Sequence, residues 1–131
     1  MLKIRYFAII TLIWISFQVS GQKIRKSDLV GCWTASREEN IQGSNVSIYR
    51  PCDYKVFPPS RYRFNMDLKS DSTCSWLVLA INDGHYMVDG TWTFNEATNE
   101  LKLYNTEGKE ESKFIIEEVK DNILKVKSRA L

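Results

Sequence analysis

The sequence has few of the residues that usually carry catalytic or metal chemistry. Its 131 residues include a single histidine, His85, and three cysteines. The cysteine spacings match no zinc motif, and a catalytic histidine needs a nucleophile or an orienting carboxylate converging on it. The sequence around His85 or Cys74 places no such group. We therefore expect no enzyme activity, no metal site and no cofactor.

The chain also lacks an apolar run long enough to cross a membrane, which takes about 20 residues. A shorter run over residues 7–17 follows Lys3 and Arg5, and the small residues Val19 and Gly21 suit the recognition positions of a signal peptidase. A positive start, a short apolar core and a small-residue exit are typical of a secretory signal peptide. The alternative, an uncleaved anchor, would need a longer run. We expect export to the periplasm or the medium, without stable membrane insertion.

Once the predicted signal peptide, residues 1–21, is removed, neither sign of charge is in excess. The leader holds two of the 18 basic residues and none of the 16 acidic ones, so residues 22–131 carry 16 of each. Nucleic-acid binding requires a concentrated positive field, so we do not expect it. The length of the mature chain suits one domain.

Residues 22–131 contain no long helical pattern. Apolar and polar residues alternate there instead, with a period of two. Within residues 61–69, apolar side chains alternate with charged or polar ones, so one row faces a core and the other faces water. Residues that favour tight turns separate such segments. We predict eight strands, near residues 29–36, 44–50, 61–69, 73–81, 85–94, 100–105, 112–119 and 122–128.

This spacing predicts an all-β fold, an eight-stranded antiparallel up-and-down barrel whose closure removes exposed sheet edges. A barrel of eight strands is just wide enough to be filled by its own side chains or to hold one small ligand. Residues 74–81 are apolar on both faces, so we expect another segment of the fold to cover their outer face.

The predicted inward row is rich in aromatic residues, and it allows two interpretations. It forms either an apolar cavity for a small lipophilic molecule or a solid core. The row consists of Trp33, Tyr62, Phe64, Met66, Trp76, Trp92, Phe94, Leu103, Phe114 and Val126.

Residues 49–64, YRPCDYKVFPPSRYRF, combine basic, aromatic and proline residues. Prolines cannot donate to a central ladder, so we interpret the first part as a bent connection that leads into a strand. The excess of Arg and Lys leaves recognition of an anionic group or acidic partner as the alternative.

Four stretches in order resemble small secreted bacterial lipocalin-like domains. Gly31-Cys32-Trp33 fits the G-x-W signature that opens lipocalins, and the later stretches lie at similar spacing. These are Tyr62-Arg63-Phe64 leading to a turn at Asp71, Asn82-Asp83-Gly84-His85 followed by Gly90-Thr91-Trp92, and the closing hairpin from Phe114 to Leu124. The sequence departs from the family at Ser72, where glycine is common, and in lacking a helix after the barrel.

The resemblance implies an eight-stranded lipocalin-like barrel that binds a hydrophobic ligand. It also implies that Trp33 closes one end, with Arg129 or Lys127 packed over its indole. With strands running as in this family, Cys32 and Cys52 lie towards one end, which favours a Cys32–Cys52 disulfide. Cys52–Cys74 remains the alternative, and either pairing leaves one free thiol.

These observations predict an exported, non-catalytic, lipocalin-like binding module, with a small hydrophobic molecule as the ligand. The alternative is a solid barrel that serves as a protein-interaction or structural module. Its partner would then meet the surface near residues 50–63 or the outer face of the fourth strand.

Overall fold

A computed structural model describes residues 22–82 and 84–127, and these form a β-barrel with two single-turn 3-10 helices. The predicted signal peptide and Arg129 lie outside the described residues. In the part of the chain that the structure describes, no helix is long and apolar enough to cross a membrane.

All eight predicted strands are present, close to their predicted positions. The 3-10 helix η1 (Lys26–Leu29) precedes β1, and the second, η2 (Arg37–Glu39), follows it. The strands are β1 (Gly31–Ala35), β2 (Val46–Pro51), β3 (Asn65–Leu68), β4 (Thr73–Leu79), β5 (His85–Asn95), β6 (Glu100–Asn105), β7 (Glu110–Lys120) and β8 (Ile123–Lys127).

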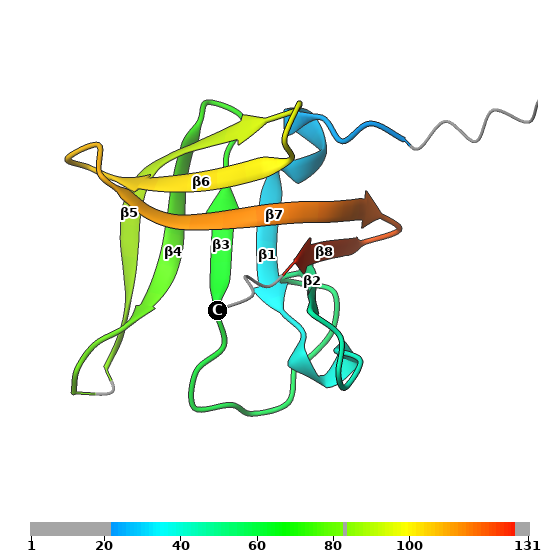
Figure 1. Ribbon diagram of the computed structural model, residues 1–131. Coiled ribbons are helices and arrows are strands. Elements are labelled where there is room, and N and C mark those ends of the chain that lie inside the picture. Colours follow the sequence, from blue (N-terminus) through cyan, green and yellow to red (C-terminus); the bar gives the residue numbers. More distant parts are fainter. Residues whose placement is uncertain (1–21, 83, 128–131) are drawn as a thin grey trace, which may run out of the picture.

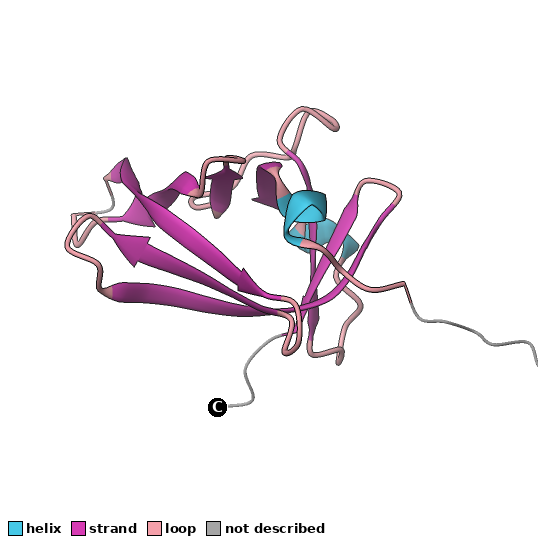
Figure 2. Ribbon diagram, turned by 90° about the horizontal axis from the view of Figure 1, so that it is seen from above, coloured by secondary structure: helices cyan, strands magenta, loops and turns pink. Residues whose placement is uncertain are grey.

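The strands form one closed antiparallel barrel, as predicted. Figure 1 shows β6 and β7 crossing over β1, β3 and β4, so the barrel has two layers with crossed strands. In packings of this kind, the two layers are joined at corners, where a strand bends from one layer into the other. In Figure 2 the strands curve around a common interior.

The predicted up-and-down order is wrong at one place. The order around the barrel is β1-β2-β8-β7-β6-β5-β4-β3, so β1 lies between β2 and β3. Because β1 is antiparallel to both neighbours, β2 and β3 run in the same direction, and the chain between them must return along the length of the barrel. The meander is therefore regular only from β3 to β8.

The crossover after β2 also explains why β3 is shorter than predicted. The expected strand was 61–69, whereas β3 begins at Asn65. Residues 52–64 form the crossover, which contains Pro58 and Pro59. Its two end residues bond to the backbone of β1: Cys52 N donates to Cys32 O at 3.0 Å, and Phe64 O accepts a hydrogen bond from Ala35 N at 2.8 Å. Proline removes backbone donors, so this segment cannot form a ladder along its whole length.

The final hairpin has the tight turn that its sequence predicts. Asp121 and Asn122 have positive φ values of 53° and 59°, and Lys120 pairs with Ile123 across them. Two central residues with φ > 0 define the type I′ turn, whose twist matches that of the strands. Ser72 likewise has a positive φ, of 70°.

The outer face of β4 is not covered as expected. Leu79 remains 45% exposed and Ile81 fully exposed beyond it, while Val56, a residue of the crossover, is itself 98% exposed. The apolar end of the β4–β5 hairpin therefore faces solvent.

Candidate functional site

The barrel interior is occupied by most of the side chains that we predicted to line it. Six of the ten are at most 7% exposed: Trp33, Met66, Trp76, Trp92, Leu103 and Val126. Phe64, Phe94 and Phe114 are partly buried against them, and the rings of Phe64 and Phe114 are 5.7 Å apart. Trp33, Trp76 and Trp92 thus contribute bulk to the core, which favours the solid-core interpretation.

Two residues of the predicted row, Tyr62 and Phe64, lie outside the strands, and Phe64 still packs against the core. Tyr62 lies farther from the start of β3. Its hydroxyl donates to Leu77 O at 2.9 Å, and its ring meets His85 edge-on at 5.6 Å. Tyr62 therefore belongs to the crossover and contacts the β4–β5 hairpin. The alternation that predicted a strand from residue 61 begins four residues before the true start of β3 at Asn65.

Arg50, in the basic stretch 49–64, is buried, and its guanidinium group is hydrogen-bonded within the fold. The residue is 9% exposed, and its guanidinium donates two hydrogen bonds to the Glu39 carboxylate, at 2.7 and 2.8 Å, and one to Asn122 O. The hydrogen bonds from Arg50, joined by one from Ser36, lower the pKa of Glu39 to about 2. This arginine fixes η2 and the last turn against β2.

Arg63 has a similar role at the other end of the crossover. It forms a two-pronged ion pair with Glu38 and also donates to Ala35 O and Pro58 O. The hydrogen bonds from Arg63 lower the pKa of Glu38 to about 2. Since both guanidinium groups are bonded within the chain, the stretch is better explained as a braced connection than as an anion site.

Trp33 lies near the end of the barrel where η1 packs, and its indole N–H donates to Leu29 O at 2.9 Å. The predicted partner Lys127 is not beside it, because β8 runs parallel to β1 and Lys127 pairs with Val46, at the opposite end. A cation does lie over an indole near η1, but the pair is Lys26 over Trp92, at 4.7 Å. The cation comes from the segment before β1 and not from the last strand.

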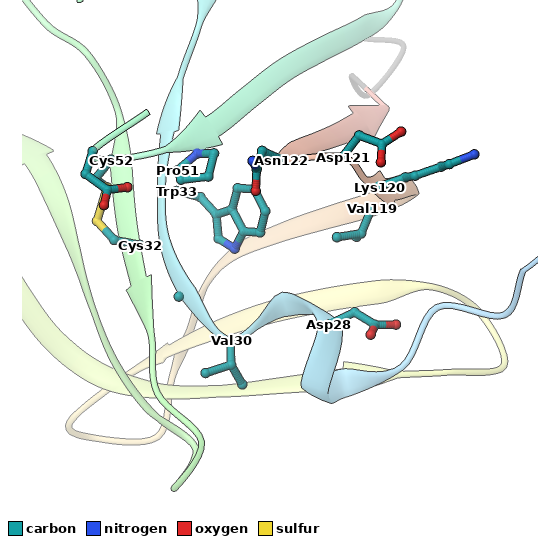
Figure 3. Close-up of a pocket in the computed structure, with 12 residues that line it drawn as sticks. Asp28, Val30, Cys32, Trp33, Pro51, Cys52, Val119, Lys120, Asp121 and Asn122 are labelled. Atoms are coloured by element: carbon teal, nitrogen blue, oxygen red, sulfur yellow. A yellow bond between two sulfur atoms is a disulfide. The ribbon is translucent and has the colours of Figure 1, made fainter. Parts of the chain in front are cut away.

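A groove opens beside Trp33, which is itself part of the core (Figure 3). The predicted Cys32–Cys52 disulfide is present at one side, reinforced by a hydrogen bond from Cys52 N to Cys32 O at 3.0 Å. The β7–β8 turn forms the opposite side. The groove encloses about 600 Å³ and is lined by Asp28, Val30, Gly31, Cys32, Trp33, Pro51, Cys52, Asp53, Val119, Lys120, Asp121 and Asn122.

The groove combines an apolar floor with a mainly acidic rim. Its floor and walls include the Trp33 indole, Pro51, Val119 and the disulfide, and Val30 is 40% exposed. The charged residues that line the groove are Asp28, Asp53, Asp121 and Lys120, and the Asp28 carboxylate also accepts a hydrogen bond from Arg25 N at 2.9 Å. Its volume falls in the range of small-molecule sites, about 300–1,000 Å³. In residues 22–82 and 84–127, no cluster of three or more potential ligands could hold a metal ion.

Cys74 and His85 do not form a reactive site together. Cys74 is buried in β4, and burial, aided by Asp89 and Asp67, raises the pKa of its thiol to about 11. A thiol with such a pKa is protonated at neutral pH and therefore a poor nucleophile. His85 is exposed at the start of β5, where its ring contacts Tyr62.

Sequence reasoning missed this groove because its rim residues lie far apart along the chain. Asp28 comes from η1, Asp53 from the crossover and Asp121 from the β7–β8 turn, and no local pattern links them. The one available signal was the expected closeness of Cys32 and Cys52, which brings two of these segments together.

Comparisons with protein-family models, with curated proteins and with solved structures found no match to this chain.

Proposed function

We propose that the chain is an exported, non-catalytic binding protein that takes its ligand in the groove beside the Cys32–Cys52 disulfide. The proposal rests on the difference between the barrel interior and the surface beside Trp33. Bulky side chains fill the interior, whereas the apolar floor beside Trp33 borders an open volume of about 600 Å³. The disulfide supports export, because such bonds persist mainly in oxidising compartments.

The lining of the groove indicates the ligand's chemistry. Apolar surface around Trp33, Pro51 and Val119 suits an apolar body, while three carboxylates against one ammonium group at the rim favour a cationic end. The ligand is therefore a small amphipathic molecule that carries an amine. The resemblance to lipocalin-like domains agrees with a small, largely apolar ligand, but the binding site proposed here lies outside the barrel interior.

The test is a titration of isotope-labelled protein, purified after export, with a series of alkyl- and arylamines monitored by NMR. We expect saturable shifts at Gly31, Cys32 and Asn122. Val30→Trp should fill the groove and weaken binding by about tenfold or more, the loss that accompanies about 1.4 kcal/mol. The matched control is Ile115→Trp on β7, where the native side chain is 37% exposed, against 40% for Val30, and does not line the groove.

Two results would contradict the proposal. Shifts confined to interior residues such as Met66 and Leu103 would show that the ligand enters the barrel. Absence of saturable shifts throughout the amine series, with the protein folded, would remove the groove as a site for this class of ligand.

A further inference from the structure

The β4–β5 hairpin extends beyond the rest of the barrel and leaves part of β5 with only one neighbour. β6 pairs with β5 only from Gly90 to Asn95, whereas β4 pairs with β5 from His85 to Thr91. Among the described strands, the segment His85–Asp89 therefore pairs with β4 alone. Figure 1 shows this end of the hairpin projecting past β6 and β7, at the lower left of the view.

The hydrogen bonds at the two ends of the hairpin show which backbone groups face the open edge. Ala80 N donates to Gly84 O at 2.7 Å, and Trp92 N donates to Ser72 O at 2.9 Å. Because hydrogen-bonded pairs alternate in an antiparallel ladder, the even-numbered residues of β5 direct their backbone groups at β4. The N–H and C=O groups of His85, Met87 and Asp89 consequently point away from β4, towards the open edge.

The side chains on this edge are unusually apolar for an exposed strand. Tyr86 is 51% exposed and Met87 49% exposed, with Leu79 opposite His85 at 45%. Exposed strand edges are commonly protected by charged side chains, above all lysine, by proline or by a bulge; His85–Asp89 has a single carboxylate at its end, that of Asp89, and no lysine, proline or bulge. An unpaired edge with apolar side chains on both faces is a surface suited to strand addition.

We propose that two copies of this chain associate through antiparallel pairing of their His85–Asp89 edges. A two-fold axis at Met87 brings each residue opposite a partner of suitable chemistry. The imidazole of His85 then faces the Asp89 carboxylate of the other copy, Tyr86 faces Val88, and Met87 faces Met87. The outward backbone groups of His85, Met87 and Asp89 all fall at hydrogen-bonded positions, where each pair exchanges both of its N–H···O bonds.

This self-complementarity is the reason to choose a second copy over an unrelated peptide. The segment His-Tyr-Met-Val-Asp places a hydrogen-bond donor at one end and an acceptor at the other, so an antiparallel copy satisfies both ends at once. The contact is small, and small interfaces give weak, concentration-dependent association.

Sedimentation equilibrium over a concentration series, on protein purified after export, tests the proposal. We expect a monomer–dimer equilibrium that Met87→Lys weakens about tenfold or more, because like charges would face each other across the axis. Ile115→Lys, which changes a similarly exposed apolar residue on β7, should leave the equilibrium unchanged. A single monomeric species at every concentration, or a dimer equally stable in Met87→Lys, would overturn the proposal.

A second measurement does not depend on the stability of the lysine variant. In the proposed register the two Cα atoms at position 87 lie about 5.5 Å apart, within the range that a disulfide bridges. Met87→Cys should therefore form a covalent dimer on mild oxidation, whereas Ile115→Cys and the wild-type protein, whose free Cys74 is buried, should not. Equal cross-linking of Met87→Cys and Ile115→Cys would contradict the proposed register.

Discussion

At Gly90 in β5, an added methyl group would lie 1.9 Å from the carbonyl oxygen of Tyr104 and 2.8–2.9 Å from two ring atoms of Trp76. The first neighbour is backbone and the second is a buried indole, so neither can move away easily. The absence of a side chain at this position allows β6 and the Trp76 ring to approach β5 closely. The sequence motif Gly90-Thr91-Trp92 marked the position, but its steric reason becomes visible only in three dimensions.

Gly90→Ala should therefore destabilise the fold by about 3 kcal/mol, at the upper end of overpacking costs because the clash involves backbone. Equilibrium unfolding in urea measures the change. Gly84→Ala is the matched control, since its added methyl group would meet only the exposed side chain of Asn82 and no backbone, and a change within about 0.5 kcal/mol is expected. Equal stability of Gly90→Ala and the wild type would show that β5 and β6 separate readily here.

Among the elements, η2 is held in place mainly by charge. Glu39 lies at its end and accepts two hydrogen bonds from Arg50 of β2 and one from Ser36. The pKa of Glu39 falls from 4.5 to about 2, so the carboxylate's contribution is complete above pH 4.5 and is lost as the pH falls towards 2.

Glu39→Gln should lower stability at neutral pH by about 1–3 kcal/mol, because a hydrogen bond between charged partners is replaced by a weaker one. The difference from the wild type should shrink as the pH falls from 4.5 to 2, since the wild-type carboxyl group then becomes neutral too. Urea unfolding at several pH values tests this expectation, with Glu117→Gln, an exposed residue of β7, as the control. A difference that stays constant across this range would mean that the charge of Glu39 is irrelevant.

Alternation in the sequence predicted the strands well, because burial on one face imposes a period of two on side chains. It could not predict which strands are neighbours. The buried pattern of β2 is the same whether it pairs with β3 or with β8, so the place of β1 between β2 and β3 left no trace in the local pattern. Tyr62 was misassigned for a related reason, since its spacing fits a strand while Pro58 and Pro59 divert the chain just before it.

For the whole molecule, the Cys32–Cys52 disulfide joins β1 to the start of the crossover, across 20 residues. Its position at the rim of the groove means that it also fixes one wall of the proposed binding site. The sequence favoured this pairing without excluding Cys52–Cys74, because the path of the crossover was unknown.

Loss of the disulfide should cost about 3 kcal/mol, the chain-entropy value for a loop of this size. The comparison is between the wild-type protein and the double variant Cys32→Ser/Cys52→Ser, each unfolded in urea with and without a reducing agent. The reducing agent should destabilise the wild type to the level of the double variant and leave the double variant unchanged. A wild-type protein that is equally stable in both conditions would contradict the expectation.

The order of strands around the barrel also constrains when the fold can be completed during synthesis. β2 pairs with β8, so the second strand of the barrel to be synthesised finds one of its two neighbours only in the eighth. Until then, the backbone groups of β2 that face β8 remain unpaired. The strands from β4 to β8, in contrast, can pair one after another with the strand that precedes them in the chain. The barrel is therefore most vulnerable to wrong partners in the interval before β8 is available to β2.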